Sequence, residues 1–102
     1  MLLSVVDRLI LLNIIDGEND IPTLRVIRQM QKDLGFTEEE LEILKFENKP
    51  NGGMVWQPGV DDKEIEIGHT PHNVVLKCFD KINQKQKMNM ELLAVFEKFE
   101  EK

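Results

Sequence analysis

The chain has 102 residues, 41% hydrophobic and 31% charged, with a formal net charge of −6. This length predicts one domain spanning residues 1–102 that folds around a single core without disulfides. The only cysteine, Cys78, fits a reducing cytoplasm. An acidic chain lacks the overall positive charge of nucleic-acid binders, so specific DNA or RNA binding is not expected.

The first helix is expected over residues 2–15. Its apolar residues cover most of its circumference, and its narrow polar stripe consists of Ser4, Asp7 and Arg8. Such a helix is either surrounded by the rest of the domain or faces another subunit. We therefore predict a homodimer with Leu11 and Leu12 at the interface, the alternative being a helix that its neighbours enclose completely. Polar interruptions and short length exclude this segment as a membrane span.

A tight corner is expected between helices at about Pro22–Leu34 and Glu38–Lys45. Thr37 and Glu40 have the spacing of a capping box, and Gly35 is expected to be the left-handed residue that ends the longer helix. The buried stripe of that helix is predicted to comprise Leu24, Ile27, Met30 and Leu34. The corner is similar in shape to a helix-turn-helix, but its second helix opens with three carboxylates, which would repel phosphates.

The middle of the chain is predicted to be β-structure. Residues 49–53 are turn formers flanked by short strands, which predicts a hairpin, and alternation over Lys63–Ile67 predicts a third strand beside it. Two more helices are expected, one capped by Thr70 and one from about Met90. The fold class is therefore α+β, mainly helical, with about five helices and a small antiparallel hairpin or three-stranded sheet near residues 46–67.

A candidate ligand or partner site rests on basic residues and the only tryptophan. If the second and fourth helices lie side by side, their basic residues would line an anion pocket, and the tryptophan would stack on a base or anchor an interface. The residues are Arg25, Arg28, Lys32, Trp56, Lys77 and Lys81. The alternative is a solvated basic face and a core tryptophan.

Catalytic and metal signatures are weak. His69 and His72 have Cys78, Asp61 and Asp62 nearby in sequence, but no second ligand pair, so no metal or cofactor is expected. Cys78 and His72 would point in different directions on one helix, and no nucleophile elbow, P-loop or dinucleotide fingerprint occurs. We therefore predict that the chain is not an enzyme.

Five segments carry a resemblance to a known family. Residues 11–15, 23–27, 36–40, 64–68 and 93–99 resemble a family of small phage and prophage proteins that has no assigned activity. The likeness lies in core and cap residues, so no functional residue carries over. The resemblance implies a phage accessory protein acting in the bacterial host cytoplasm.

Three functions are therefore considered. The first is a non-enzymatic accessory protein that engages or inhibits a host protein, such as a defence or transcription component. The second is a sponge for a small anionic signalling nucleotide, held by the basic residues and Trp56. The third is a winged-helix-like DNA-binding regulator with the hairpin as its wing.

Overall fold

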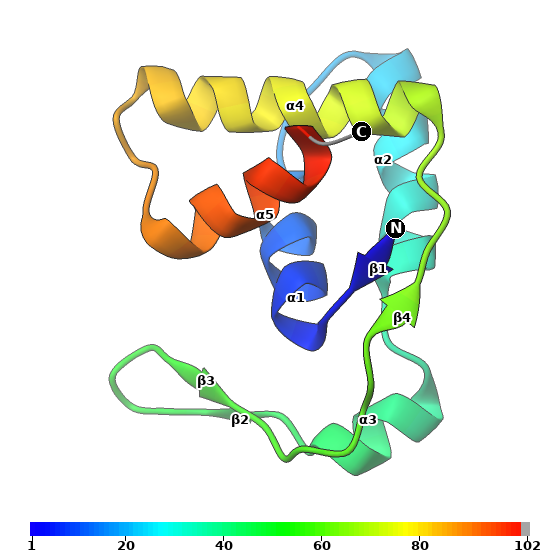
Figure 1. The fold of residues 1–102 in the computed structure, drawn as a ribbon, viewed down its shortest axis with the longest axis vertical. Helices are drawn as coiled ribbons and strands as arrows, with labels where there is room; N and C mark the ends of the chain where they lie inside the picture. The colour runs from blue at the N-terminus through cyan, green and yellow to red at the C-terminus, as the bar shows by residue number, and fades with distance from the viewer. Residues whose placement is uncertain (101–102) are drawn as a thin grey trace.

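A computed structural model describes residues 1–100, and it is a mainly helical α+β fold (Figure 1). Five helices and two small antiparallel two-stranded sheets make up the described chain, which confirms the expected class. In chain order they are β1 (Leu2–Leu3), α1 (Val5–Ile14), α2 (Ile21–Leu34), α3 (Glu38–Leu44), β2 (Glu47–Asn48), β3 (Met54–Val55), β4 (Lys63–Glu64), α4 (His69–Gln84) and α5 (Met90–Glu100). No helix in the described range is long and apolar enough to cross a membrane.

The first helix begins later than expected because its first residues belong to a strand. Leu2 pairs with Glu64 and Leu3 with Lys63, so β1 lies antiparallel to β4. Ser4 then caps α1: its side chain accepts from the backbone N–H of Asp7, and the Asp7 side chain accepts from the backbone N–H of Ser4. This reciprocal pair fixes the start of the helix at Val5.

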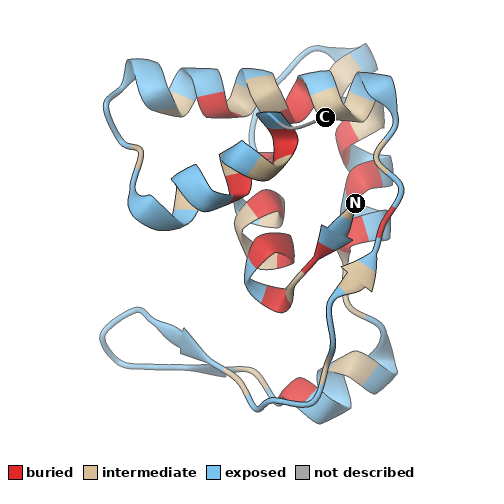
Figure 2. Ribbon diagram, in the orientation of Figure 1, coloured by how far each residue is buried: buried red, intermediate tan, exposed pale blue. Residues whose placement is uncertain are grey.

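Helix α1 lies in the centre of the helical part of the fold, packed against α2, α4, α5 and β1 (Figures 1 and 2). Leu11 has no exposed surface and Leu12 is half-buried against the same core. Leu11 was predicted to lie at a dimer interface, but its own chain covers it completely, so it cannot contact a second subunit. Val6 of α1 remains 41% exposed, so the surrounding elements do not enclose the helix completely, and the homodimer itself stays a prediction.

Helix α2 and the corner that follows it differ from expectation at two residues, Leu24 and Gly35. Gly35 has an extended backbone, with φ −63° and ψ 165°, rather than a left-handed one. A Cβ there would lie 2.9 Å from the carbonyl oxygen of Gln31, so close approach explains this glycine. Leu24 was expected to be buried but is exposed, whereas Ile27, Met30 and Leu34 are buried as predicted.

The β2–β3 hairpin lies at the opposite end of the molecule from α4 (Figure 1). Glu47 pairs with Val55 and Asn48 with Met54, which confirms the hairpin. The expected third strand does not join it, because β4 pairs with β1 instead. Alternating side chains reveal a strand but not its hydrogen-bonding partner.

Helices α4 and α5 are connected by residues 85–89 and pack against each other. Thr70 was predicted to cap α4, but the helix begins at His69 and its cap is Gly68. Helix α5 begins at Met90 as predicted, and the Asn89 side chain accepts from the backbone N–H of Leu92. The rings of Phe79 and Phe96 meet edge to face at 5.4 Å between the two helices.

Candidate functional site

An apolar groove of about 920 Å³ lies between α4 and α5 and is called here the α4–α5 groove. Its lining residues are His72, Leu76, Phe79, Asp80, Asn83, Met88, Asn89, Met90, Leu93, Phe96, Phe99 and Glu100. Phe79 and Phe99 are buried beneath it, and Leu76, Met88 and Phe96 are half-buried. Met90 is 79% exposed and Leu93 37% exposed along the α5 wall. The groove thus has a packed aromatic floor and an open apolar wall.

His72 and Phe99 close one end of the groove, where α4 begins and α5 ends. The His72 Nε2 lies 2.7 Å from the carbonyl oxygen of Phe99, and the two rings stack with centroids 5.5 Å apart. At the other end, Met88 contributes from the connecting segment, in which Gln86 adopts a left-handed φ of 55°. The two helices are therefore joined at one end by the His72–Phe99 contact and at the other by the connecting segment.

The rim of the groove is acidic. Asp80 on α4 and Glu100 on α5 are exposed, and the described lining residues include no lysine or arginine. The Asp80 carboxylate accepts a hydrogen bond from Gln84 at 3.0 Å, which holds it at the α4 edge. The charged side chains that line the groove are therefore both carboxylates, one on each wall.

Sequence reasoning missed this groove, although a signal was present. Helix α5 packs inward through Leu92, Val95, Phe96 and Phe99, which are buried or half-buried, but Met90 and Leu93 extend its apolar surface to a second side. A helix that packs on one face needs only one apolar stripe. The wider apolar surface of α5 therefore signalled a second contact surface.

The predicted basic site is only partly assembled. Helices α2 and α4 do lie side by side, and Lys77 and Lys81 share a small pocket with Asp20 and Thr23 at the start of α2. Asp20 already supplies a carboxylate there: it accepts from the Thr23 backbone N–H, and this hydrogen bond with nearby Lys77 and Lys81 lowers the pKa of Asp20. An added anion would have to compete with that carboxylate.

The other basic residues point elsewhere. Arg25, Arg28 and Lys32 are all exposed. With about 100° between successive residues, they lie on the opposite side of α2 from Ile27, Met30 and Leu34, which face the core. The structure therefore does not bring these three residues together with Lys77 and Lys81.

Trp56 belongs to a separate aromatic row at the base of the hairpin. It is half-buried and meets Phe46 edge to face at 5.9 Å, and Phe46 meets Phe36 in the same way at 5.3 Å. This row lies at the hairpin end of the molecule, away from α4 (Figure 1). Trp56 is therefore not placed to stack on a base held by Lys77 and Lys81.

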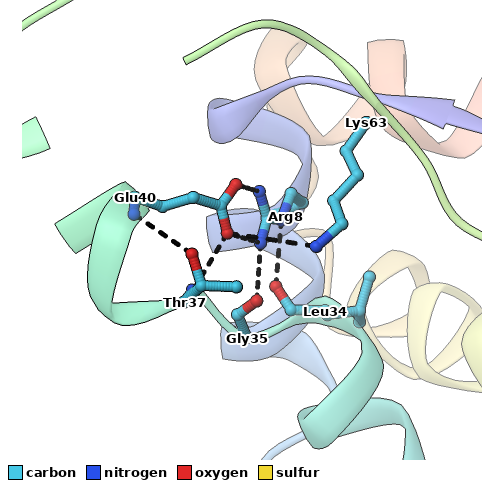
Figure 3. A network of polar contacts seen from close by, with 6 residues as sticks. All are labelled: Arg8, Leu34, Gly35, Thr37, Glu40 and Lys63. Atoms are coloured by element: carbon cyan, nitrogen blue, oxygen red, sulfur yellow. Dashed lines mark hydrogen bonds and ion pairs between the residues drawn. The ribbon is translucent and has the colours of Figure 1, made fainter. Parts of the chain in front are cut away.

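Arg8 is the most surprising side chain, because the sequence places it on an exposed stripe and the structure buries it completely. Its Nε donates to the carbonyl oxygen of Leu34 at 3.0 Å and its Nη2 to that of Gly35 at 2.5 Å (Figure 3). Its two Nη atoms also donate to the Glu40 carboxylate at 2.8 and 3.1 Å. The guanidinium lies 4.1 Å above the Phe36 ring. Arg8 thus joins α1 to the corner between α2 and α3.

Glu40 links this ion pair to the capping box. Its side chain accepts from the Thr37 backbone N–H, and the Thr37 hydroxyl accepts from the Glu40 backbone N–H, as predicted. The hydrogen bonds from Arg8, with the Thr37 bond and Lys63 at 4.0 Å, lower the pKa of Glu40 to about 2. Glu40 is therefore ionised wherever the protein is folded near neutral pH.

Asp7 forms a second link, to α5. Its buried carboxylate accepts from Lys98 and from the Ser4 backbone. Burial alone would raise the pKa of Asp7, but the Lys98 and Ser4 hydrogen bonds lower it below its usual value. Two carboxylate pairs therefore hold α1 to its neighbours.

The histidines and Cys78 have other partners. His69 lies 3.2 Å from the Asn73 amide, while His72 contacts Phe99. Cys78 is half-buried beside Lys81, and burial raises the pKa of its thiol. Among residues 1–100, no group of three histidine, cysteine or acidic side chains is placed to hold a metal ion.

Compared with protein-family models, curated proteins and solved structures, the chain matches none of them.

Proposed function

We propose that this chain acts by binding another protein through the α4–α5 groove and not by catalysis. One observation carries this proposal: a groove of about 920 Å³ has a buried aromatic floor, an exposed apolar wall and polar lining residues that are mostly exposed. Protein-binding sites combine an apolar centre with a polar rim in this way. Methionines 88 and 90 add side chains that adapt to differently shaped partners.

The other two functions have less support. A nucleotide sponge needs converging cations, but Lys77 and Lys81 already face Asp20, and Trp56 lies at the other end of the fold. A DNA reader needs a recognition helix that approaches phosphates, but α3 has seven residues and begins with Glu38, Glu39 and Glu40. Neither the nucleotide sponge nor the DNA reader therefore has a site as well formed as the α4–α5 groove.

The resemblance to phage and prophage proteins supplies the biological setting of the proposal. A small phage accessory protein acts in the cytoplasm of the bacterial host, and its partner there is a host protein. Inhibition of a defence or transcription component fits a chain that binds without catalytic machinery. This setting rests on the resemblance alone.

Affinity capture with matched variants tests the proposal. Leu93 on the groove wall is 37% exposed and Leu24 on α2 is 39% exposed, so Leu93→Gln and Leu24→Gln change equally accessible leucines. We expect a host protein captured by the chain to be retained by Leu24→Gln and lost with Leu93→Gln, measured by quantitative mass spectrometry. A set of captured proteins that is the same for both variants would contradict the proposal.

A further inference from the structure

We infer that the occupant of the α4–α5 groove is an amphipathic helix with basic residues along its polar flanks. This inference rests on the proposed function, since it names the partner chemistry of the same groove. It depends on three properties of the described residues: which backbone groups the groove offers, how long it is, and which charges border it.

The backbone of the groove favours a helical occupant. Most of the lining residues belong to α4 and α5, whose peptide groups are hydrogen-bonded within each helix. An extended segment would find no strand edge to pair with there and would bury peptide groups against leucine and phenylalanine side chains. A helix satisfies its own peptide groups, and so it can lie on these walls without that cost.

The length of the groove sets the length of the occupant. Along α4 the lining runs from His72 to Asn83, which at 1.5 Å per residue is roughly 16 Å. About three turns of helix fit this span. Large apolar side chains spaced at i, i+3 or i+4, and i+7 would reach the gaps between Leu76, Phe96 and Leu93.

The charge around the groove selects basic flanks. Asp80 borders one wall and Glu100 the other, and Glu97 is exposed on α5 between the positions of Leu93 and Glu100, four residues from one and three from the other. Lys98, the lysine nearest these residues in α5, is paired with Asp7 instead. Lysine or arginine on the flanks of the occupant would meet these carboxylates and speed association at low salt.

The same charges disfavour a second copy of this chain as the occupant. A two-fold contact places the same patch on both partners. Asp80, Glu97 and Glu100 of one copy would then share the interface with the same three carboxylates of the other, which is unfavourable. A foreign basic helix avoids this repulsion.

Fluorescence anisotropy with synthetic helices tests the inference on the full chain. The probes are fluorescein-labelled 14-residue amphipathic peptides whose three anchor positions vary among leucine, phenylalanine, methionine and tryptophan. One series carries lysine on its polar flanks and the other glutamate. We expect lysine peptides to bind at least about tenfold more tightly than their glutamate counterparts at low salt, with the advantage shrinking as salt is added.

Two pairs of variants locate the binding. Leu93→Gln should weaken the best lysine peptide at least about tenfold, a loss on the scale of a truncated interface anchor, while Leu24→Gln leaves it unchanged. The double variant Asp80→Asn with Glu100→Gln should reduce the preference for lysine over glutamate, and the control Glu38→Gln with Glu39→Gln on α3 should not. Equal binding of both series, or no effect of the groove variants, would overturn the inference.

The outcome separates this inference from the proposed function. If no peptide binds but host-protein capture still depends on Leu93, the inference fails and the groove remains a protein-binding site of another kind. If light scattering shows a dimer of the free chain that Leu93→Gln dissociates, a second copy occupies the groove, and both the inference and the host-protein proposal fail.

Discussion

Two regions of this molecule invert the usual distribution of polar and apolar side chains. Around Arg8, called here the Arg8 corner, a charged guanidinium is completely buried and bonded to Glu40 and to two backbone carbonyls. In the α4–α5 groove, leucine and methionine side chains remain exposed. The burial of a charge is expensive unless it is fully bonded, and the exposure of an apolar wall is unfavourable unless a partner covers it.

The two regions differ in whether the chain itself satisfies the unusual side chain. No described side-chain nitrogen or oxygen that is buried lacks a hydrogen-bond partner, so the Arg8 corner is complete within the chain. The groove has apolar surface left over after folding. We therefore expect changes in the Arg8 corner to reduce stability, and changes on the groove wall to reduce binding with little effect on stability.

The largest expected effect is that of Leu11→Glu, which tests the core that both regions adjoin. Leu11 has no exposed surface, so the substitution places an unpaired carboxylate among apolar side chains. We expect loss of the folded state, because domain stability is only about 5–15 kcal/mol. Circular dichroism and thermal melting would measure this. Val6→Glu, at an exposed position of α1, should stay folded, and a folded Leu11→Glu variant would place α1 outside the core.

Arg8→Ala should destabilise the protein by about 3–5 kcal/mol, the cost of breaking a buried ion pair by removing one partner. It leaves Glu40 and the carbonyls of Leu34 and Gly35 without the guanidinium. Urea unfolding provides the measurement, and Arg25→Ala at an exposed position is the control. Equal midpoints for the two variants would show that the Arg8 network adds nothing to stability.

Low pH should weaken the same corner. The folded pKa of Glu40 is about 2, below its ordinary value of 4.5. Its contribution to stability is therefore complete above pH 4.5 and is lost as the pH falls toward 2. Glu40→Gln should cost about 2 kcal/mol near neutral pH, as for a hydrogen bond to a charged group.

Comparison with Glu40→Gln separates the contribution of Glu40 to the pH dependence of stability from that of other acids, including Asp7. We expect the difference in unfolding free energy between the native chain and Glu40→Gln to shrink as the pH falls from 4.5. A difference that stays constant down to pH 3 would contradict the assigned role of Glu40.

Thr37→Ala tests the capping box beside the Arg8 corner, with an expected cost of about 1 kcal/mol. The Thr37 hydroxyl accepts from the Glu40 backbone N–H, and this bond is lost in the variant. Thr70→Ala is a matched control, because Thr70 is exposed and Gly68, not Thr70, is the cap of α4. Thermal melts of the two variants should differ, and identical melts would argue against the box.

The smallest expected effect on stability is that of Leu93→Gln, which should lie within about 0.5 kcal/mol of Leu24→Gln, as for other surface substitutions. Both leucines are similarly exposed before substitution. Urea unfolding of the two variants is the measurement. A loss of several kcal/mol in the free energy of unfolding for Leu93→Gln alone would show that the groove wall belongs to the core. The two regions would then not differ in the way described.

Features that depend on residues close together in the chain could be predicted from the amino-acid sequence. The Thr37–Glu40 capping box, the end of α2 at Leu34, the start of α5 at Met90 and the hairpin turn all formed as predicted. Each is fixed by hydrogen bonds, backbone preferences or side chains within a few positions along the chain. The α+β class follows from the same local patterns.

The side of each element that is covered, and the segment that covers it, could not be predicted from local patterns. Arg8 is buried because the carbonyls of residues 34 and 35 and the Glu40 carboxylate converge on it from more than 25 positions away. β4 pairs with β1 rather than with the adjacent hairpin, and Leu24 and Leu93 stay exposed although other apolar residues of the same helices are buried. Local patterns cannot fix these outcomes, because burial and strand pairing depend on segments that are distant in sequence and adjacent only in the folded chain.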